Sequence, residues 1–542
     1  MSTTTPKLSR RAVLGAGTAL GALPILASCG GSDPSEQAAG SVVVDDAAIL
    51  PAYTQTQPVP PDIPGRDGST PGYTTYPSDL PQTVDAPPGS GGTFTCMVPT
   101  WSGVKSGTNA FTDALDTALG AKLEYQMTTG DDYRDKQSAV FASPKDVADW
   151  VSVFGWNPPA RFDQAVEAVF EDLTPFLAGD KIAKWPNLAN LPTDAWRFGE
   201  FKGKLYGIPV PGEIVTDAIF YRSDIFSGMG MEAPRSPEDF LAACAELTDP
   251  GAGRWACNDM RSAAPNLLFG APPDWRMVDG SLQYRWETQE YRDALEFQRE
   301  LFSKEYVHPD VAADSGDAKQ RFQGGQVAIH YDGVGAWGEM ISTMRAAHPE
   351  ATIAAMTGLS AGGKPIRYKG SAANFFSFLK KSDDPARIEE LLGIANFLAA
   401  PFGTKEWELA SFGVEGTHFT RDANGVPVPT EALKEQHPGV LATLVAGPVA
   451  KYDFSQPDFV TQYCEWMAGE AQYLQDGPFG TYRITRPVEY ASLDQPMYDL
   501  EVDVARGRKS MDDFDAAVKT WKSSGGDRMR EFYMSVYEQL PR

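Results

Sequence analysis

The chain has 542 residues, more than one hydrophobic core usually organises, so two lobes or domains are expected. Hydrophobic residues make up 42% of the chain and charged residues 22%, which is the composition of an ordinary globular protein. The formal net charge of −25 argues against nucleic acid and anionic lipid as partners, because their phosphates would be repelled.

Residues 1–28 predict an export signal of the lipoprotein type. Ser-Arg-Arg-Ala-Val-Leu at residues 9–14 resembles a twin-arginine motif, and a Gly/Ala/Leu-rich stretch follows it. Leu26-Ala27-Ser28-Cys29 resembles a bacterial lipobox, in which Cys29 is lipidated and becomes the new N-terminus. The alternative is a membrane-anchoring helix with an unrelated cysteine, but the stretch is short and contains glycines and Pro24. We expect an exported protein on the extracellular face of the cytoplasmic membrane, held there by lipid only.

Residues 29–91 are rich in Pro, Gly, Ser, Thr and Asp and have no helical periodicity. Such a composition predicts an extended, disordered tether that lifts the folded part from the membrane. The folded part is expected to cover residues 92–542.

Strand-like and helix-like segments alternate from residue 93 onward. Thr93 to Val98, Leu123 to Met127 and Trp150 to Phe154 are short runs of strand type, with helix-like spacing between them. A later helix is opened by Asp384 at a capping position and Pro385 at the first helical position. The alternation predicts an α/β fold with a mainly parallel sheet covered by helices.

Four cysteines follow Cys29. Cys244 and Cys257 are 13 positions apart, and an exported protein can form disulfides, so this pair is a candidate disulfide. The alternative is that these two, together with Cys96 and Cys464, are buried free thiols.

The sequence contains no catalytic or metal motif. The five histidines have no metal-binding spacing, and no G-x-S-x-G segment occurs. Residues 358–364 match G-x-x-x-x-G-K, but Pro365 replaces the Ser or Thr that would reach magnesium. We therefore predict no cofactor, no metal and no enzymatic activity. A pair of carboxylates among the 72 acidic residues is enough for a glycosidase, so a secreted glycoside hydrolase or lyase is the alternative.

Several segments, in order along the chain, resemble motifs of extracellular solute-binding proteins of the carbohydrate type, relatives of maltodextrin-binding protein. Gly-Lys-Leu-Tyr-Gly-Ile-Pro-Val at 203–210 is similar to the family's G-K-x-Y-G-I-P segment. The strand at 218–226 also resembles the family, although Arg222-Ser223 departs from the usual Asn-Lys. Phe322–Ile329 and Asp332–Trp337 are also similar to segments of the family. Gly413–Gly416 and Trp521–Tyr533 resemble segments of a subgroup of larger family members.

The resemblance implies a two-lobed, type II periplasmic-binding-protein fold that closes on its ligand. Lobe 1 would span about 92–213 and 374–420, and lobe 2 about 217–368 and parts of 421–542. The implied function is to capture a carbohydrate, expected to be an oligosaccharide, and deliver it to the permease subunits of an ATP-binding-cassette importer, as a monomer. A peptide- or polyamine-binding protein is a further alternative.

Aromatic and polar residues near the ends of predicted strands are the candidate ligand contacts. A sugar offers a flat C–H face that stacks on aromatic rings and hydroxyls that bond to carboxylates and amides. Clefts in α/β folds open at the carboxyl ends of strands, and the family commonly places an acidic ligand-binding residue at the hinge. The predicted ligand-binding residues are Trp101, Trp156, Asn157, Glu213, Trp275, Asp332 and Trp337. For any single tryptophan, packing in the core is the alternative.

Overall fold

The computed structural model describes residues 46–542, with the exception of 67, 102–106, 157, 160–161, 314, 481, 483, 485 and 541–542. The chain divides into two units, Met1–Ala39 and Gly40–Arg542, and the described residues all belong to the second. The predicted signal segment and Cys29 therefore lie outside the described residues. Within the described part, no helix has the length and apolar character needed to cross a membrane.

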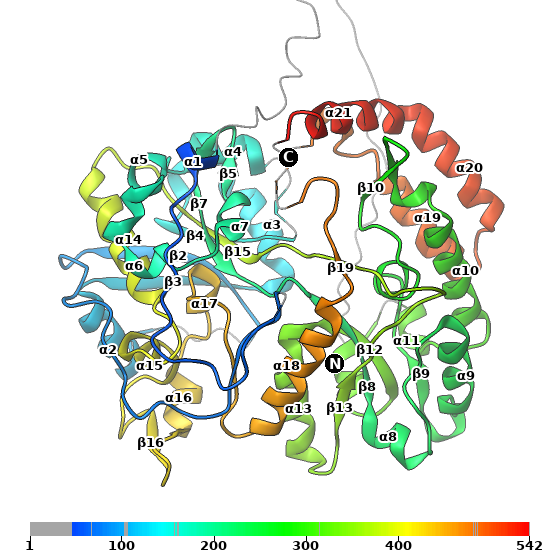
Figure 1. Ribbon diagram of the computed structural model, residues 1–542, viewed down its shortest axis with the longest axis horizontal. Helices are drawn as coiled ribbons and strands as arrows, with labels where there is room; N and C mark the ends of the chain where they lie inside the picture. Colours follow the sequence, from blue (N-terminus) through cyan, green and yellow to red (C-terminus); the bar gives the residue numbers. More distant parts are fainter. Residues whose placement is uncertain are drawn as a thin grey trace, which may run out of the picture. The chain divides into compact units, whose positions relative to one another are not determined.

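The first lobe is built on a five-stranded sheet (Figure 1). Its order is β3-β2-β4-β15-β7, with strands Lys122–Thr129, Thr93–Thr100, Trp150–Phe154, Ala373–Leu379 and Gly207–Pro211. β2 runs parallel to β3 and β4, whereas β15 runs antiparallel to β4 and β7. All five residues of β4 are buried, as expected for a central strand covered on both faces. The helices of this lobe include α2 (Ala110–Leu119), α3 (Gly130–Phe141) and α14 (Pro385–Leu398).

The sequence explains where these helices begin and end. Asn109 caps α2, because its side chain accepts hydrogen bonds from the backbone N–H groups of Phe111 and Thr112. Gly120 ends α2 with a φ of 65°, a left-handed conformation that favours glycine. α14 has the predicted Asp384 cap and begins with Pro385.

The second lobe contains a four-stranded sheet and a helical subdomain. The sheet order is β13-β8-β12-β9, with strands Ile353–Ala355, Asp217–Arg222, Val327–Gly333 and Trp255–Cys257. Helices α9 (Pro237–Leu247), α13 (Trp337–Ala347) and α18 (Pro457–Ala471) bury their apolar faces in the cores that also contain these strands. The predicted α/β class is confirmed. The expectation of a mainly parallel sheet is wrong, because β8 runs antiparallel to β12 and β13 and the sheet of the first lobe is also mixed.

The helical subdomain has its own hydrophobic core. It consists of the hairpin β10–β11 (Trp275–Val278 and Ser281–Tyr284) and helices α10 (Gln289–Ser303), α19 (Gln495–Ala505), α20 (Met511–Trp521) and α21 (Asp527–Tyr537). Figure 1 shows the red and orange helices of the chain end beside green α10, so segments far apart in sequence share this core.

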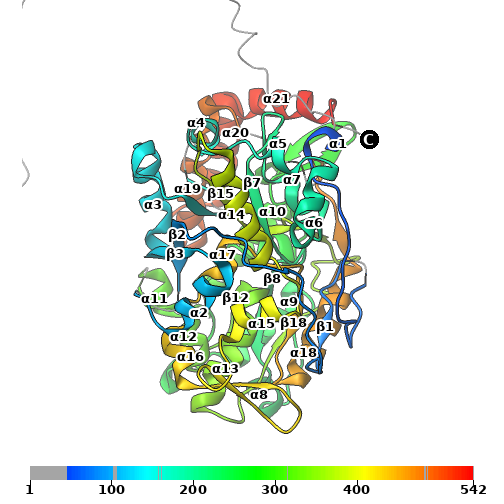
Figure 2. The same ribbon diagram turned by 90° about the vertical axis from the view of Figure 1, so that its left-hand side faces the viewer.

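The prediction of a disordered tether is wrong for residues 46–91, which we call the N-terminal strap. The strap begins with α1 (Asp46–Ile49), and Leu50, with 5% of its surface exposed, packs in the core of the first lobe. β1 (Gly72–Tyr73) then pairs in parallel with β18 (Lys451–Tyr452). Figures 1 and 2 show this blue segment running along the body.

The strap is ordered because single apolar residues between its prolines fit pockets on the body, and its backbone bonds to neighbouring segments. The Gly179 N–H donates to the carbonyl of Leu50, and Glu406 accepts from the N–H groups of Thr83 and Val84. Hydrophobic periodicity cannot reveal such a segment, since it forms almost no helix or sheet of its own.

Part of the segment after residue 420 packs with the first lobe. α16 (Glu431–Gln436) packs against α2, and α17 (Leu441–Leu444) packs against β4 and β15.

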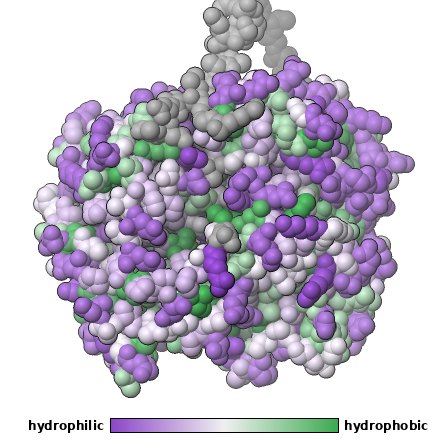
Figure 3. All heavy atoms as spheres, viewed as in Figure 1, coloured by the Kyte–Doolittle hydropathy of each residue, from purple (hydrophilic) through white to green (hydrophobic). Residues whose placement is uncertain are grey.

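Hydrophilic residues dominate the face of the molecule drawn in Figure 3, and hydrophobic residues reach it in scattered groups. Among the large hydrophobic side chains of the described residues, the two with the greatest exposed fraction are Trp101 and Trp156, at 62% each. Their rings are exceptional, because indoles are usually largely buried.

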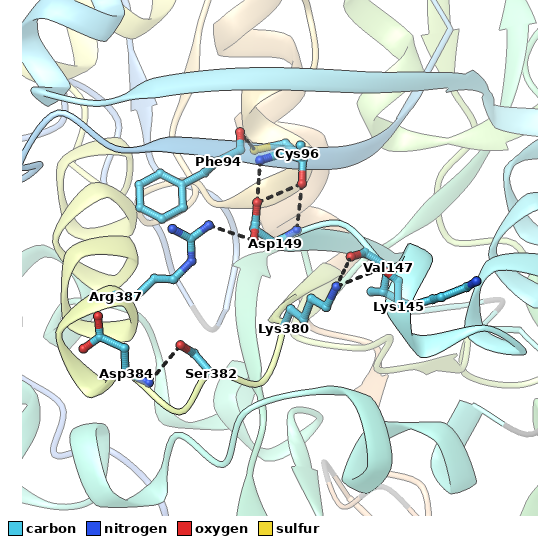
Figure 4. Close-up of polar contacts among 10 residues, drawn as sticks. Phe94, Cys96, Lys145, Val147, Asp149, Lys380, Ser382, Asp384 and Arg387 are labelled. Carbon is cyan, nitrogen blue, oxygen red and sulfur yellow. Dashed lines mark hydrogen bonds and ion pairs between the residues drawn. The ribbon is translucent and has the colours of Figure 1, made fainter.

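A polar network ties together the amino ends of β2 and β4 (Figure 4). Asp149 accepts hydrogen bonds from the N–H and hydroxyl of Thr95, both at 2.9 Å, and forms a 2.8 Å ion pair with Arg387 on α14. The Arg387 guanidinium lies 4.4 Å from the centre of the Phe94 ring. Burial alone would raise the pKa of Asp149, but these hydrogen bonds and the Arg387 charge hold it below its ordinary value. The network fixes the sheet at the end opposite the carboxyl ends of β2 and β4.

Candidate ligand-binding site

Trp101 and Trp156 lie at the same edge of the first sheet. Trp101 follows the last residue of β2, and Trp156 is two residues beyond the end of β4. Because β2 and β4 are parallel, their carboxyl ends meet at one edge, as predicted for a binding cleft.

The two exposed indoles rest on two phenylalanine rings. The Trp156 ring stacks on Phe154 with 4.8 Å between centroids and 20° between planes. Phe375 of β15 lies 5.2 Å from Trp156, and Trp101 lies 5.9 Å from Phe154. We call these four residues the aromatic cluster. Phe154 is buried and Phe375 half-buried, so together they support the exposed rings.

Two segments that connect the sheets pack side by side. Residues 212–216 lead from β7 to β8, and residues 369–372 lead from β14 (Arg367–Tyr368) to β15. The Gly212 N–H donates to the carbonyl of Ala372, and the Gly370 N–H donates to the carbonyl of Ile214.

The two connections pack closely at two glycines. A Cβ added to Gly212 would lie 2.4 Å from Oδ1 of Asn374, and one added to Gly370 would lie 2.2 Å from Cγ2 of Thr216. Both distances are far below van der Waals contact. The close packing sets the position of Glu213, which is next to Gly212.

A cavity of about 600 Å³ adjoins the aromatic cluster at Phe375, and most of its wall comes from the first lobe. Parts of this wall come from Glu213 of the first connection, from Asn374 and Phe375 at the start of β15, and from residues 445–450. Phe375 belongs to both the cavity wall and the aromatic cluster. Most other lining residues are apolar, which is typical of a small-molecule site with a few polar groups.

Glu213 is held by a neighbouring tyrosine. Its Oε1 accepts a 2.9 Å hydrogen bond from the hydroxyl of Tyr463 on α18. Burial, followed by the charge of Glu213, raises the pKa of Tyr463 far above its ordinary value, so this hydroxyl remains a donor. Lys451 lies close by, with its ammonium 4.5 Å from the centre of the Tyr463 ring, and burial lowers its pKa.

The structure contradicts the predicted ligand contacts at Trp337 and Trp275. Trp337 has none of its surface exposed, because its ring is enclosed by Phe220, Phe459, Tyr463 and Trp466. Trp275 is 4% exposed and packs against Tyr284 and Tyr533 in the core of the helical subdomain. Both residues are therefore core residues.

The remaining predicted contacts have different outcomes. Glu213 lines the cavity, whereas Asp332, on β12, is not among the lining residues. Nε2 of His330 is 3.5 Å from Asp332; although burial opposes ionisation, this neighbour and the Gly333 N–H lower the pKa of Asp332. Asn157 lies outside the described residues.

Cys244 and Cys257 are buried free thiols, so the predicted disulfide is not formed in the structure. Burial, followed by a contact with Cys257, raises the pKa of Cys244 well above its ordinary value. Cys96 and Cys464 are also buried and free. No cluster of three or more His, Cys, Asp or Glu side chains suited to a metal ion occurs within the described ranges.

The sequence analysis missed Phe154, Phe375 and Asn374. Phe154 ends a strand that was predicted correctly, and the other two lie at the start of β15, after the second connection. A rule that tests both ends of the central strands, rather than tryptophans alone, would have found them.

Comparisons with known proteins agree with this architecture. Residues 105–401, more than half of the chain, match the family model of bacterial extracellular solute-binding proteins. The polygalacturonan/rhamnogalacturonan-binding protein YtcQ of Bacillus subtilis is 20% identical over 67% of this chain and 76% of that protein. Lipoprotein LipO of the same species is 22% identical over 78% of this chain and 88% of that protein.

Among solved structures, the alginate-binding protein AlgQ2 superposes with a TM-score of 0.61 at 15% identity, covering 84% of this chain and 99% of that chain. This likeness confirms the predicted two-lobed fold. On the match over residues 105–401, the chain belongs to the bacterial extracellular solute-binding protein family.

Proposed function

We propose that this solute-binding protein captures a carbohydrate, an oligosaccharide, by stacking sugar rings on Trp101 and Trp156. The observation that carries the proposal is the pair of indoles, each 62% exposed, at one edge of the sheet beside a cavity. Two large apolar rings that lie together and are exposed to water often mark a binding site. The C–H face of a pyranose fits such rings.

Polar groups beside the rings would receive the sugar hydroxyls. Glu213 and Asn374 line the cavity and supply a carboxylate and an amide. The curated relative named above is described as binding polygalacturonan and rhamnogalacturonan, which supports a saccharide ligand for this chain as well.

A catalytic role has less support. Glycoside hydrolysis generally uses two carboxyl groups on either side of the scissile bond, separated by about 5 to 9.5 Å. Within the part of the chain that the structure describes, Glu213 is the only Asp or Glu that lines the cavity. In the proposed function, the protein therefore binds its ligand and releases it chemically unchanged.

The test is a panel of oligosaccharides of different composition, screened by the melting temperature of the protein. Since a ligand that binds only the folded state stabilises it, a true ligand raises the melting temperature in a concentration-dependent manner. Each hit is then incubated with the protein and examined by chromatography. Release of shorter products would identify a hydrolase or lyase, and stabilisation by peptides or polyamines alone would refute carbohydrate binding.

We further propose that the protein is a monomeric lipoprotein that delivers its ligand to permease subunits of an ATP-binding-cassette importer. The lipobox at Leu26–Cys29 and the match to lipoprotein LipO support the anchor. Cys29→Ser is expected to shift the protein from the membrane fraction to the medium or to an uncleaved precursor. A mature wild-type protein that begins at another residue and has no lipid would contradict the anchor.

A further inference from the structure

We propose that the ligand is an uncharged oligosaccharide and that the cavity discriminates against uronic acids. The inference rests on the proposed carbohydrate-binding function and specifies its substrate class. It follows from the charges in and around the cavity.

The cavity wall contains one ionisable acid and no strong base. Among the described residues that line the cavity, Glu213 is the only Asp or Glu, and there is no lysine or arginine. A uronate carboxylate entering this space would lose hydration without an ionic partner and would approach a second carboxylate. A neutral sugar would instead donate its hydroxyl hydrogens to Glu213.

Two cations in or next to the second connection have partners. Arg367 forms a 2.8 Å ion pair with Glu470 and donates to the carbonyl of Asp217. Lys369 forms a 2.8 Å ion pair with Asp476. Neither belongs to the cavity wall, so neither offers a ready site for a ligand carboxylate.

Lys451 interacts electrostatically with Glu213, but it is not among the residues that line the cavity. Its ammonium is 4.7 Å from the centre of the Phe459 ring and 4.5 Å from that of Tyr463. Burial lowers the pKa of Lys451, and the charge of Glu213 offsets this effect only in part. Selective carboxylate recognition commonly uses the fork of an arginine, and none is available in this wall.

The experiment compares matched pairs of oligosaccharides, equal in length and linkage, by titration calorimetry. The pairs are galactose with galacturonic acid, glucose with glucuronic acid, and mannose with mannuronic acid oligomers. We expect the neutral member of the bound pair to bind at least tenfold tighter at physiological salt. Glu213→Gln should reduce that ratio several-fold, whereas Glu232→Gln, which removes a charge at an exposed position, should leave it unchanged.

Each outcome has a defined meaning. Equal or tighter binding of the acidic member would overturn the charge inference and leave carbohydrate binding intact. A lack of binding by every member of all pairs would instead count against the proposed function. If Glu213→Gln does not fold, the salt dependence of wild-type binding replaces it, since higher salt should weaken repulsion and narrow the gap between the two members.

Discussion

Trp156 and Trp337 stand in similar places in the sequence but in opposite environments in the structure. Each follows shortly after a buried strand, yet Trp156 has 62% of its surface exposed and Trp337 has none. The difference lies in what comes next. Trp337 begins α13, where Met340, Ile341 and Met344 lie three, four and seven positions later and share its buried face. A tryptophan that starts an amphipathic helix joins the core, and one in a loop remains free to bind.

Trp337→Ala gives the largest effect expected from this comparison. Removing a fully buried indole should lower the free energy of unfolding by about 3–5 kcal/mol, because a cavity remains between the lobe-2 sheet and α18. Denaturant unfolding of the ligand-free protein measures it. Trp156→Ala is the control and should change this free energy by less than about 0.5 kcal/mol. Similar losses in the two variants would contradict the assignment.

The same logic applied to the strap gives a second prediction. Leu50→Ala should lower the free energy of unfolding by about 2–5 kcal/mol, because Leu50 packs in the core of the first lobe. Tyr53→Ala, three residues later and 48% exposed, should have little effect. Thermal and denaturant unfolding of both variants provide the comparison. If Leu50→Ala is as stable as wild type, packing of the strap at Leu50 does not stabilise the fold, which would contradict this prediction.

Acid should lower the free energy of unfolding by less than the two substitutions above, through Asp149 at the amino end of the first sheet. The folded state holds the pKa of Asp149 below its ordinary value, so the unfolded state binds this proton more tightly. Its contribution is therefore complete above the ordinary aspartate pKa of about 3.9 and is lost as pH falls through the lower, folded value. Asp149→Asn should remove about 1 kcal/mol at neutral pH, since the side chain is partly exposed. It should also flatten the acid dependence in this range; an unchanged pH profile would exclude a role for this carboxylate.

Much of the fold was predictable because its signals are local. Strands β2, β3 and β4 contain short runs of strand type, and α14 has its predicted Asp384 cap. The strap was not predictable in this way. Its order depends on single residues such as Leu50 and Tyr73 that pack against distant parts of the chain.

The site was predictable only where it depends on strand ends. Trp101, Trp156 and Glu213 followed from their places after strands or at a lobe connection, and the structure puts them at the sheet edge or in the cavity wall. The prediction for Trp275 was wrong because its hairpin packs against α21 in a separate core. Burial of this kind depends on which helices return to cover a hairpin, and that information is not local.

Titration calorimetry of Trp156→Ala with an oligosaccharide that binds the wild type tests the central claim most directly. Loss of a stacking indole should weaken binding by about 1–3 kcal/mol, roughly tenfold to a hundredfold in Kd, while the melting temperature of the ligand-free protein stays near that of wild type. An unchanged Kd in folded Trp156→Ala, measured again in Trp101→Ala with the same result, would contradict the aromatic cluster as the binding surface.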